Sequence, residues 1–225
     1  ASVESTMKIL EVAKDNNASI VYLSSMEQYG VPYEYGQNMT EDKVGVIDHL
    51  NIRSSYSESK RLCECLCASY ASEYGVNVKI ARLAQTFGAG VPLTDNRMPM
   101  QFARAAVEGD DIVLHTEGMS ISNFVYLMDA ITAIIILLEN GEKGQAYNVC
   151  NDRETRSVRE IADLVANSVA NGKIQVRVEK KDNMGYAPDV AMYLDSGKLR
   201  KLGWNARVGM IEAYKRLLEY LNESE

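Results

Sequence analysis

The chain has 225 residues, of which 46% are hydrophobic, and its formal net charge is −7. This length and apolar content are enough for one sizeable hydrophobic core and too little to predict a second independent one. The acidic balance argues against a nucleic-acid-binding protein, and no apolar run is long enough to cross a membrane.

The N-terminal third of the chain alternates helical and strand-like patterns. Apolar residues recur at helical spacing over residues 2–16. This differs from the charged and then apolar leader of a secreted protein, so we expect a cytoplasmic location. A nearly continuous apolar run predicts a buried parallel strand over residues 19–23. A long polar loop, residues 30–53, then leads to a helix over residues 56–74, which Gly75 would end in a left-handed conformation.

The rest of the chain continues this alternation. We expect strands over residues 76–83, 112–114, 124–127, 146–150 and 174–178. We expect helices over residues 98–108, 130–139, 156–170, 196–202 and 208–221. Asp129 would N-cap the second of these helices, and Ser157 with Glu160 has the spacing of a capping box. Alternating strands and helices predict an α/β fold with a parallel sheet.

The four cysteines do not have the spacing of a metal site. Cys63, Cys65 and Cys67 are two residues apart on the predicted helix, so consecutive ones point to different sides, and Cys150 lies far along the chain. We expect reduced, partly buried thiols and no metal.

Tyr56 and Lys60 lie four residues apart on the predicted helix, one turn above the other. A lysine ammonium beside a tyrosine lowers the pKa of its hydroxyl, which can then exchange a proton with a substrate hydroxyl while a hydride moves. Ser25, just after the strand over residues 19–23, could hold the same substrate oxygen. Carbonyl–alcohol chemistry with a nicotinamide needs these three groups.

The order of strand, serine, loop, Tyr-x-x-x-Lys helix, strand and glycine loop resembles the extended short-chain dehydrogenase/reductase family, in particular its nucleotide-sugar epimerase/dehydratase branch. The resemblance runs over essentially the whole chain. It implies a Rossmann-like parallel sheet, with residues 1–90 as the remainder of a dinucleotide-binding domain. Residues 91–225 would form mainly a small α/β substrate-binding region, with the strand over residues 146–150 returning to the sheet.

The glycine-rich turn that binds the dinucleotide in this family has no counterpart here. Gly88-Ala89-Gly90 follows a late strand and opens no immediate helix. Roughly a hundred residues, about half of a doubly wound nucleotide-binding unit, are therefore expected to be missing. We favour a fragment over a natural protein that lost this half. The resemblance implies NAD or NADP as cofactor and leaves the choice between them open.

The resemblance also implies roles for individual residues. Tyr56 would be the acid/base, Lys60 would bond the nicotinamide ribose, and Ser25 would orient the reacting oxygen. Ser24 and Leu83 would lie against the cofactor. Arg82 is expected to be structural.

Glu27 occupies the place of a catalytic glutamate in the related dehydratases and UDP-glucuronate decarboxylases, and a solvent-facing loop acid is an equal alternative. On the substrate side, the family has an asparagine where this chain has Gln85. It has arginines where this chain has Ser122 and Tyr186. The arginine that decarboxylases place just before Asp129 is Met128. Arg97, Lys180 or Lys181 could replace the lost charges as phosphate-binding groups.

Together with the resemblance, these observations predict an NAD(P)-dependent epimerase/dehydratase acting on a sugar, and we expect nucleotide-linked sugars as substrates. Alternatives are a 4,6-dehydratase or decarboxylase using Glu27, a ketone reductase that releases its product, and a catalytically degenerate binding or dimerisation protein. The resemblance also implies a homodimer, in which helices 2–16 and 56–74 would pair with those of a second copy. A seam on the second helix fits this pairing, formed by Leu62, Cys63, Leu66, Cys67 and Tyr70.

Overall fold

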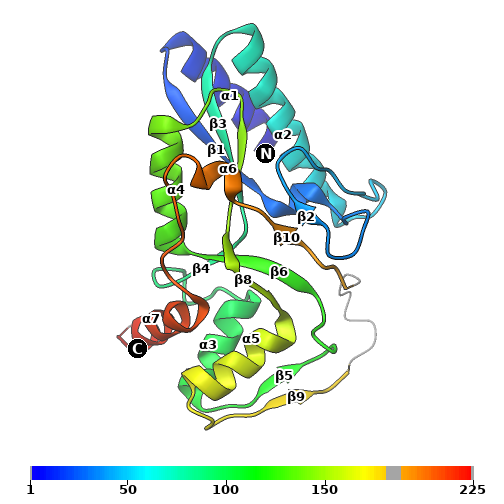
Figure 1. Ribbon diagram of the computed structural model, residues 1–225, viewed down its shortest axis with the longest axis vertical. Coiled ribbons are helices and arrows are strands. Elements are labelled where there is room, and N and C mark those ends of the chain that lie inside the picture. The colour runs from blue at the N-terminus through cyan, green and yellow to red at the C-terminus, as the bar shows by residue number, and fades with distance from the viewer. Residues whose placement is uncertain (1, 181–188, 224–225) are drawn as a thin grey trace.

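The computed structural model describes residues 2–180 and 189–223 (Figure 1). The helices are α1 (Ser2–Asp15), α2 (Ser54–Glu73), α3 (Met98–Glu108), α4 (Leu127–Asn140), α5 (Val158–Leu164), α6 (Gly197–Arg200) and α7 (Met210–Glu223), with the short turns η1 (Met26–Tyr29) and η2 (Val165–Val169). The strands are β1 (Ser19–Ser25), β2 (Asn38–Met39), β3 (Asn77–Leu83), β4 (Gln85–Phe87), β5 (Ile112–Leu114), β6 (Ile121–Tyr126), β7 (Ala146–Val149), β8 (Asn151–Ser157), β9 (Val176–Val178) and β10 (Tyr193–Leu194). None of the helices in the described part is both long and apolar enough to cross a membrane.

The central sheet is parallel and has the strand order β1-β3-β7. Alternate side chains of β3 face opposite sides. Val78 and Ile80 pack with α1 and α2, whereas Ala81 packs with α4. Figure 1 shows this arrangement, with α1 and α2 on one side of the strands and α4 on the other. The prediction of an α/β fold with a parallel sheet is confirmed.

The C-terminal half builds a second core below this sheet. Helices α3, α5 and α7 gather there under the strands β4, β6 and β8 (Figure 1). Strand β6 runs parallel to β4 but antiparallel to β8, so this part is not wholly parallel. The polar sequence of β8 has no strand-like apolar run, and the helix predicted from residue 156 begins only at Val158. The predicted capping box of Ser157 and Glu160 is confirmed.

The N-cap predicted at Asp129 is wrong. Helix α4 begins two residues earlier, at Leu127, so Asp129 lies inside its first turn. Its buried carboxylate instead accepts hydrogen bonds from the backbone N–H groups of Arg207 and Val208, both at 2.9 Å. Asp129 therefore fixes the segment that leads into α7.

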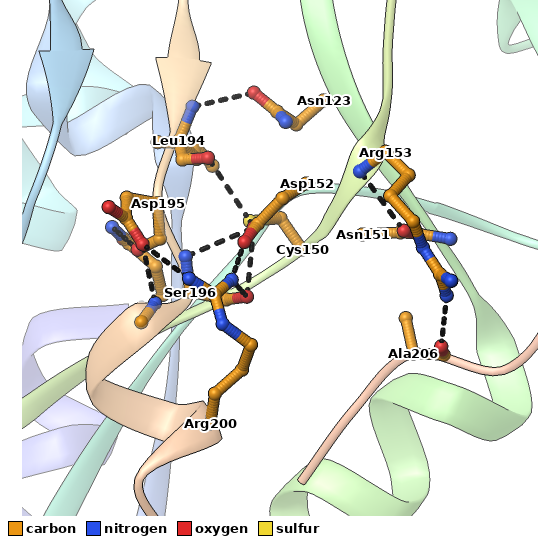
Figure 2. Close-up of polar contacts among 12 residues, drawn as sticks. Asn123, Cys150, Asn151, Asp152, Arg153, Leu194, Asp195, Ser196, Arg200 and Ala206 are labelled. Carbon is orange, nitrogen blue, oxygen red and sulfur yellow. Dashed lines mark hydrogen bonds and ion pairs between the residues drawn. The ribbon is translucent and has the colours of Figure 1, made fainter.

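The segment that contains β10 ties the two halves together, as Figure 2 shows. The Leu194 N–H donates to Asn123 Oδ1 on β6 at 2.6 Å. The Asp152 carboxylate, on β8, accepts hydrogen bonds from the Ser196 N–H and hydroxyl and forms an ion pair with Arg200. These contacts fix the start of β8 against the start of α6.

The cysteines of α2 face different sides, as their spacing predicted. Cys63 and Cys67 are buried against the sheet, Cys65 is exposed, and none of the four cysteines forms a disulfide. The dimer seam predicted on α2 is therefore wrong for Cys63 and Cys67, because both lie inside this chain's own core. Burial raises the pKa of Cys67 and of Cys150 to about 12.

The thiols should react at very different rates with a thiol-specific chromogenic disulfide. We expect Cys65 to react quickly at pH 8 in the native protein, since the other three thiols are buried and burial raises the pKa of Cys67 and of Cys150. All four should react in denaturant, and Cys65→Ser should remove the fast phase. Fast reaction of a second thiol in the native protein would contradict the burial of α2 against the sheet.

Candidate active site

The candidate site lies at the carboxyl ends of β1 and β3, where open α/β sheets bind their ligands. Ser25 is the last residue of β1 and pairs in register with Leu83, the last residue of β3. Ser25, predicted to contact the substrate, and Leu83, predicted to contact the cofactor, therefore lie side by side at the carboxyl edge of the sheet. The Ser25 hydroxyl accepts a hydrogen bond from the Glu27 N–H at 3.2 Å and caps η1. This fixes the hydroxyl at the strand tip.

Lys60 joins helix α2 to this strand tip. Its Nζ donates a hydrogen bond to the carbonyl oxygen of Leu23 at 2.7 Å. The same Nζ lies 5.7 Å from the ring centroid of Tyr56 and 5.1 Å from that of Tyr22. The Tyr56 side chain is half exposed. An accessible phenol thus lies beside an ammonium group that is itself anchored two residues before Ser25.

Arg61, the next residue on α2, holds the turn that follows β1. Its guanidinium donates to the backbone oxygens of Gln28, Tyr29 and Gly45 at 2.7, 3.0 and 2.9 Å. Gly45 belongs to the long loop, which is also closed by a bridge between Val31 and Val46. Arg61 of helix α2 therefore holds the turn η1 and the segment of the long loop around Gly45 against each other.

A buried polar network lies directly behind the strand tip. Arg82 on β3 forms a forked ion pair with Glu64 on α2, with its closest contact at 2.7 Å. Glu64 also accepts a hydrogen bond from the Ser24 hydroxyl. Arg82 donates to the Tyr29 hydroxyl at 2.8 Å, and Tyr29 donates to Asn148 on β7, also at 2.8 Å. The network connects α2 to all three strands of the central sheet.

Burial determines the protonation state of this network. Burial raises the pKa of Tyr29 to about 12, even though the Arg82 guanidinium opposes that shift, so Tyr29 stays protonated. Burial alone would lower the pKa of Arg82, but the hydrogen-bonded Glu64 carboxylate and the Tyr29 hydroxyl together outweigh it and the pKa is raised. The network therefore holds a lasting ion pair. A buried and protonated Tyr29 is not suited to act as an acid/base.

The predicted substrate residues are only partly brought together. The Ser122 hydroxyl on β6 contacts the Met26 sulfur at 3.5 Å, which places Ser122 next to the turn after Ser25. Gln85, a partly buried residue, opens β4 beside Phe124 of β6. Tyr186, the third predicted contact, lies outside the described residues.

The charged groups predicted around the site differ in their surroundings. Glu27 is exposed at the start of η1. Arg97 is held by the Asp95 carboxylate, with their closest contact at 2.7 Å. Lys180 pairs with Glu117 at 2.8 Å. Over residues 2–180 and 189–223, no three histidine, cysteine or acidic side chains are grouped to hold a metal ion.

Sequence reasoning missed Glu64 and gave Arg82 only a structural role. Two signals were available. Glu64 lies one helical turn beyond Lys60, on the same face. Arg82 is a charge within an otherwise apolar buried strand, where a charge requires a partner.

Several similar proteins and solved structures have names that refer to sugar nucleotides. UDP-glucuronic acid decarboxylase 1 of Danio rerio is 29% identical over 219 residues, which are 96% of this chain and 50% of that protein. The chain thus spans about half the length of the curated relatives it matches. UDP-N-acetylglucosamine 4-epimerase of Methanobrevibacter ruminantium superposes with a TM-score of 0.84 at 18% identity, over 99% of this chain and 69% of that one.

A dehydratase has the same fold. dTDP-glucose 4,6-dehydratase of Bacillus anthracis superposes with a TM-score of 0.79 at 16% identity, over 98% of this chain and 67% of that one. The model described as the NAD dependent epimerase/dehydratase family matches residues 1–150. This match includes the strand tip, the Tyr-x-x-x-Lys helix and the Glu64–Arg82 pair. The chain therefore belongs to the NAD dependent epimerase/dehydratase family.

Proposed function

We propose that the complete protein oxidises and then re-reduces one hydroxyl-bearing carbon of a nucleotide-linked sugar, with Tyr56 as acid and base. The observation that carries this proposal is the anchored ammonium group of Lys60. It bonds the strand that ends in Ser25 and lies beside the half-exposed Tyr56 ring. A module used only for binding or dimerisation has no need of all three groups, which weighs against that alternative.

The chain's own residues handle the proton. Oxidation of an alcohol carbon removes one hydride from the carbon and one proton from the hydroxyl. Tyr56, beside the Lys60 ammonium, takes that proton, and the Ser25 hydroxyl donates a hydrogen bond to the same oxygen. A bound nicotinamide cofactor would supply the acceptor for this hydride and its later donor. Return of both restores an alcohol, either inverted or after a neighbouring group has left.

The donors near the strand tip fit a nicotinamide ribose. The Lys60 ammonium has three N–H groups and uses one for the Leu23 carbonyl, which leaves two for ribose hydroxyls. Ser24 and Leu83 belong to the same strand edge and are proposed to line the cofactor. These groups would contact the nicotinamide half of the cofactor, which NAD and NADP share.

UDP-glucuronic acid is the first substrate to test, because it gives the similar decarboxylases their name. Oxidation at C4 of this sugar would leave its carboxylate β to a ketone, from which CO₂ departs readily. The exposed Glu27, two residues beyond Ser25, is proposed to assist loss of the neighbouring group. Gln85 and Ser122 are proposed to line the substrate, and so is Tyr186.

Removing the Tyr56 hydroxyl should abolish turnover. With UDP-glucuronic acid and NAD, followed by ¹H NMR, Tyr56→Phe should lower kcat by about a hundredfold to ten-thousandfold, the usual contribution of acid–base catalysis. Tyr74→Phe is the matched control, since Tyr74 ends the same helix and is 52% exposed against 50% for Tyr56. Unchanged turnover by Tyr56→Phe would eliminate this mechanism.

Glu27→Gln separates elimination or decarboxylation from plain epimerisation. If Glu27 assists loss of a group, the variant should still reduce the cofactor, seen at 340 nm, but form product about a hundredfold more slowly. Glu34→Gln, an exposed acid in the following loop, is the control. Equal rates for both variants would make Glu27 a solvent-facing acid. Net consumption of NADPH with a 4-keto sugar would instead identify a ketone reductase.

We also propose a homodimer through α1 and α2. Apolar side chains of both helices reach the surface, among them Ile9, Val12 and Leu62. Ile9 and Val12 lie three residues apart, hence on one side of α1. Ile9→Glu/Val12→Glu should convert a dimer into a monomer in light scattering coupled to size exclusion. Met119→Glu, at a site of similar exposure away from these helices, should stay dimeric. A dimeric Ile9→Glu/Val12→Glu variant would exclude this interface.

A further inference from the structure

The elements that hold the candidate catalytic groups meet through side chains of one helix. Lys60, Arg61 and Glu64 of α2 contact, in turn, the Leu23 carbonyl, the backbone of η1 and the Ser24 hydroxyl. The first two contacts end on backbone oxygens, and of these the Lys60 contact is exposed and the Arg61 contact is partly buried. The Glu64 contact is the buried one, and Glu64 is itself held from behind by Arg82.

Arg82 uses its whole guanidinium within the buried network. Its Nε and Nη2 bond both Glu64 oxygens, and its Nη1 bonds the Tyr29 hydroxyl and the Glu41 carbonyl at 2.8 and 2.9 Å. Tyr29 ends the turn that Ser25 begins. One planar group therefore contacts the helix that carries Tyr56 and the turn that carries Ser25. A lysine ammonium lacks the fork needed to do this.

We propose that the Glu64–Arg82 ion pair is a positioning device that fixes the β1 tip and η1 against helix α2, and so sets the placement of Ser25 relative to Tyr56. The inference rests on the proposed function for its catalytic consequence. Glu64 and Arg82 act through Ser24 and Tyr29, not on the substrate. Small displacements of reacting groups cost large factors in rate, which is why such a pair matters beyond stability.

A buried ion pair can often be replaced by apolar residues of similar volume without loss of stability, whereas removing one partner leaves an unpaired buried charge. Glu64→Leu/Arg82→Met is therefore the informative variant, and Glu64→Gln alone is a harsher second one. The matched control is Glu212→Leu/Arg216→Met, which removes the exposed pair of α7. All variants are made in the complete protein.

Hydrogen exchange measured by mass spectrometry tests the positioning without any substrate. In Glu64→Leu/Arg82→Met, amide exchange over residues 23–30 should become at least tenfold faster, while α7 keeps its native rate. The control pair should leave residues 23–30 unchanged. Native exchange over residues 23–30, or equal acceleration along the whole chain, would overturn the proposal, because the pair would then only stabilise the fold or do nothing local.

Kinetics with UDP-glucuronic acid and NAD supply the second readout. The double variant should lose at least tenfold in kcat with KM within threefold of native, and Arg82→Lys should not restore it. Faster local exchange with native kcat would also overturn the proposal. If the native protein does not turn over this substrate, the exchange result alone decides whether the pair positions the strand tip, and the proposed function fails separately.

Discussion

The buried ion pair of Glu64 and Arg82 is the constraint on which the candidate site depends. Removing two charges from water is costly, and the cost is offset only when geometry and additional hydrogen bonds are good. Both conditions hold here, since the guanidinium is forked onto the carboxylate and its remaining donor reaches Tyr29. The pair therefore fixes a helix, a strand tip and a turn relative to one another, and these three elements carry the proposed catalytic groups.

The parallel sheet explains why the proposed groups lie at one edge. Parallel strands place their carboxyl ends together, so Ser25 and Leu83 become neighbours although they are far apart along the chain. Helix α2 lies between β1 and β3 in the chain and packs against both. This packing places Lys60 beside β1, and Tyr56, one helical turn earlier, lies beside Lys60. The second core, with α3, α5 and α7, brings Ser122 to the same region through Met26.

Local signals predicted most elements of the fold and two features of their ends. The Ser157–Glu160 capping box is present, and Gly75 has the left-handed conformation, with φ at 72°, that ends α2. The polar strand β8 was missed because its stability comes from pairing with β6. The sequence of β8 has no apolar pattern from which this pairing could be predicted. Asp129 was misassigned because its carboxylate serves backbone groups some eighty residues away, and local spacing carries no such information.

By itself, the sequence determined the family, the alternating α/β order and the pairing of Tyr56 with Lys60, because these depend on residues close together in the chain. Only the tertiary structure decided which side chains lie behind them. Glu64 and Arg82 are eighteen residues apart, and Tyr29 and Asn148 are more distant still. Their contacts arise only after helix α2 has packed on the sheet, since a buried charge selects its partner by geometry in the folded core and not by spacing along the chain.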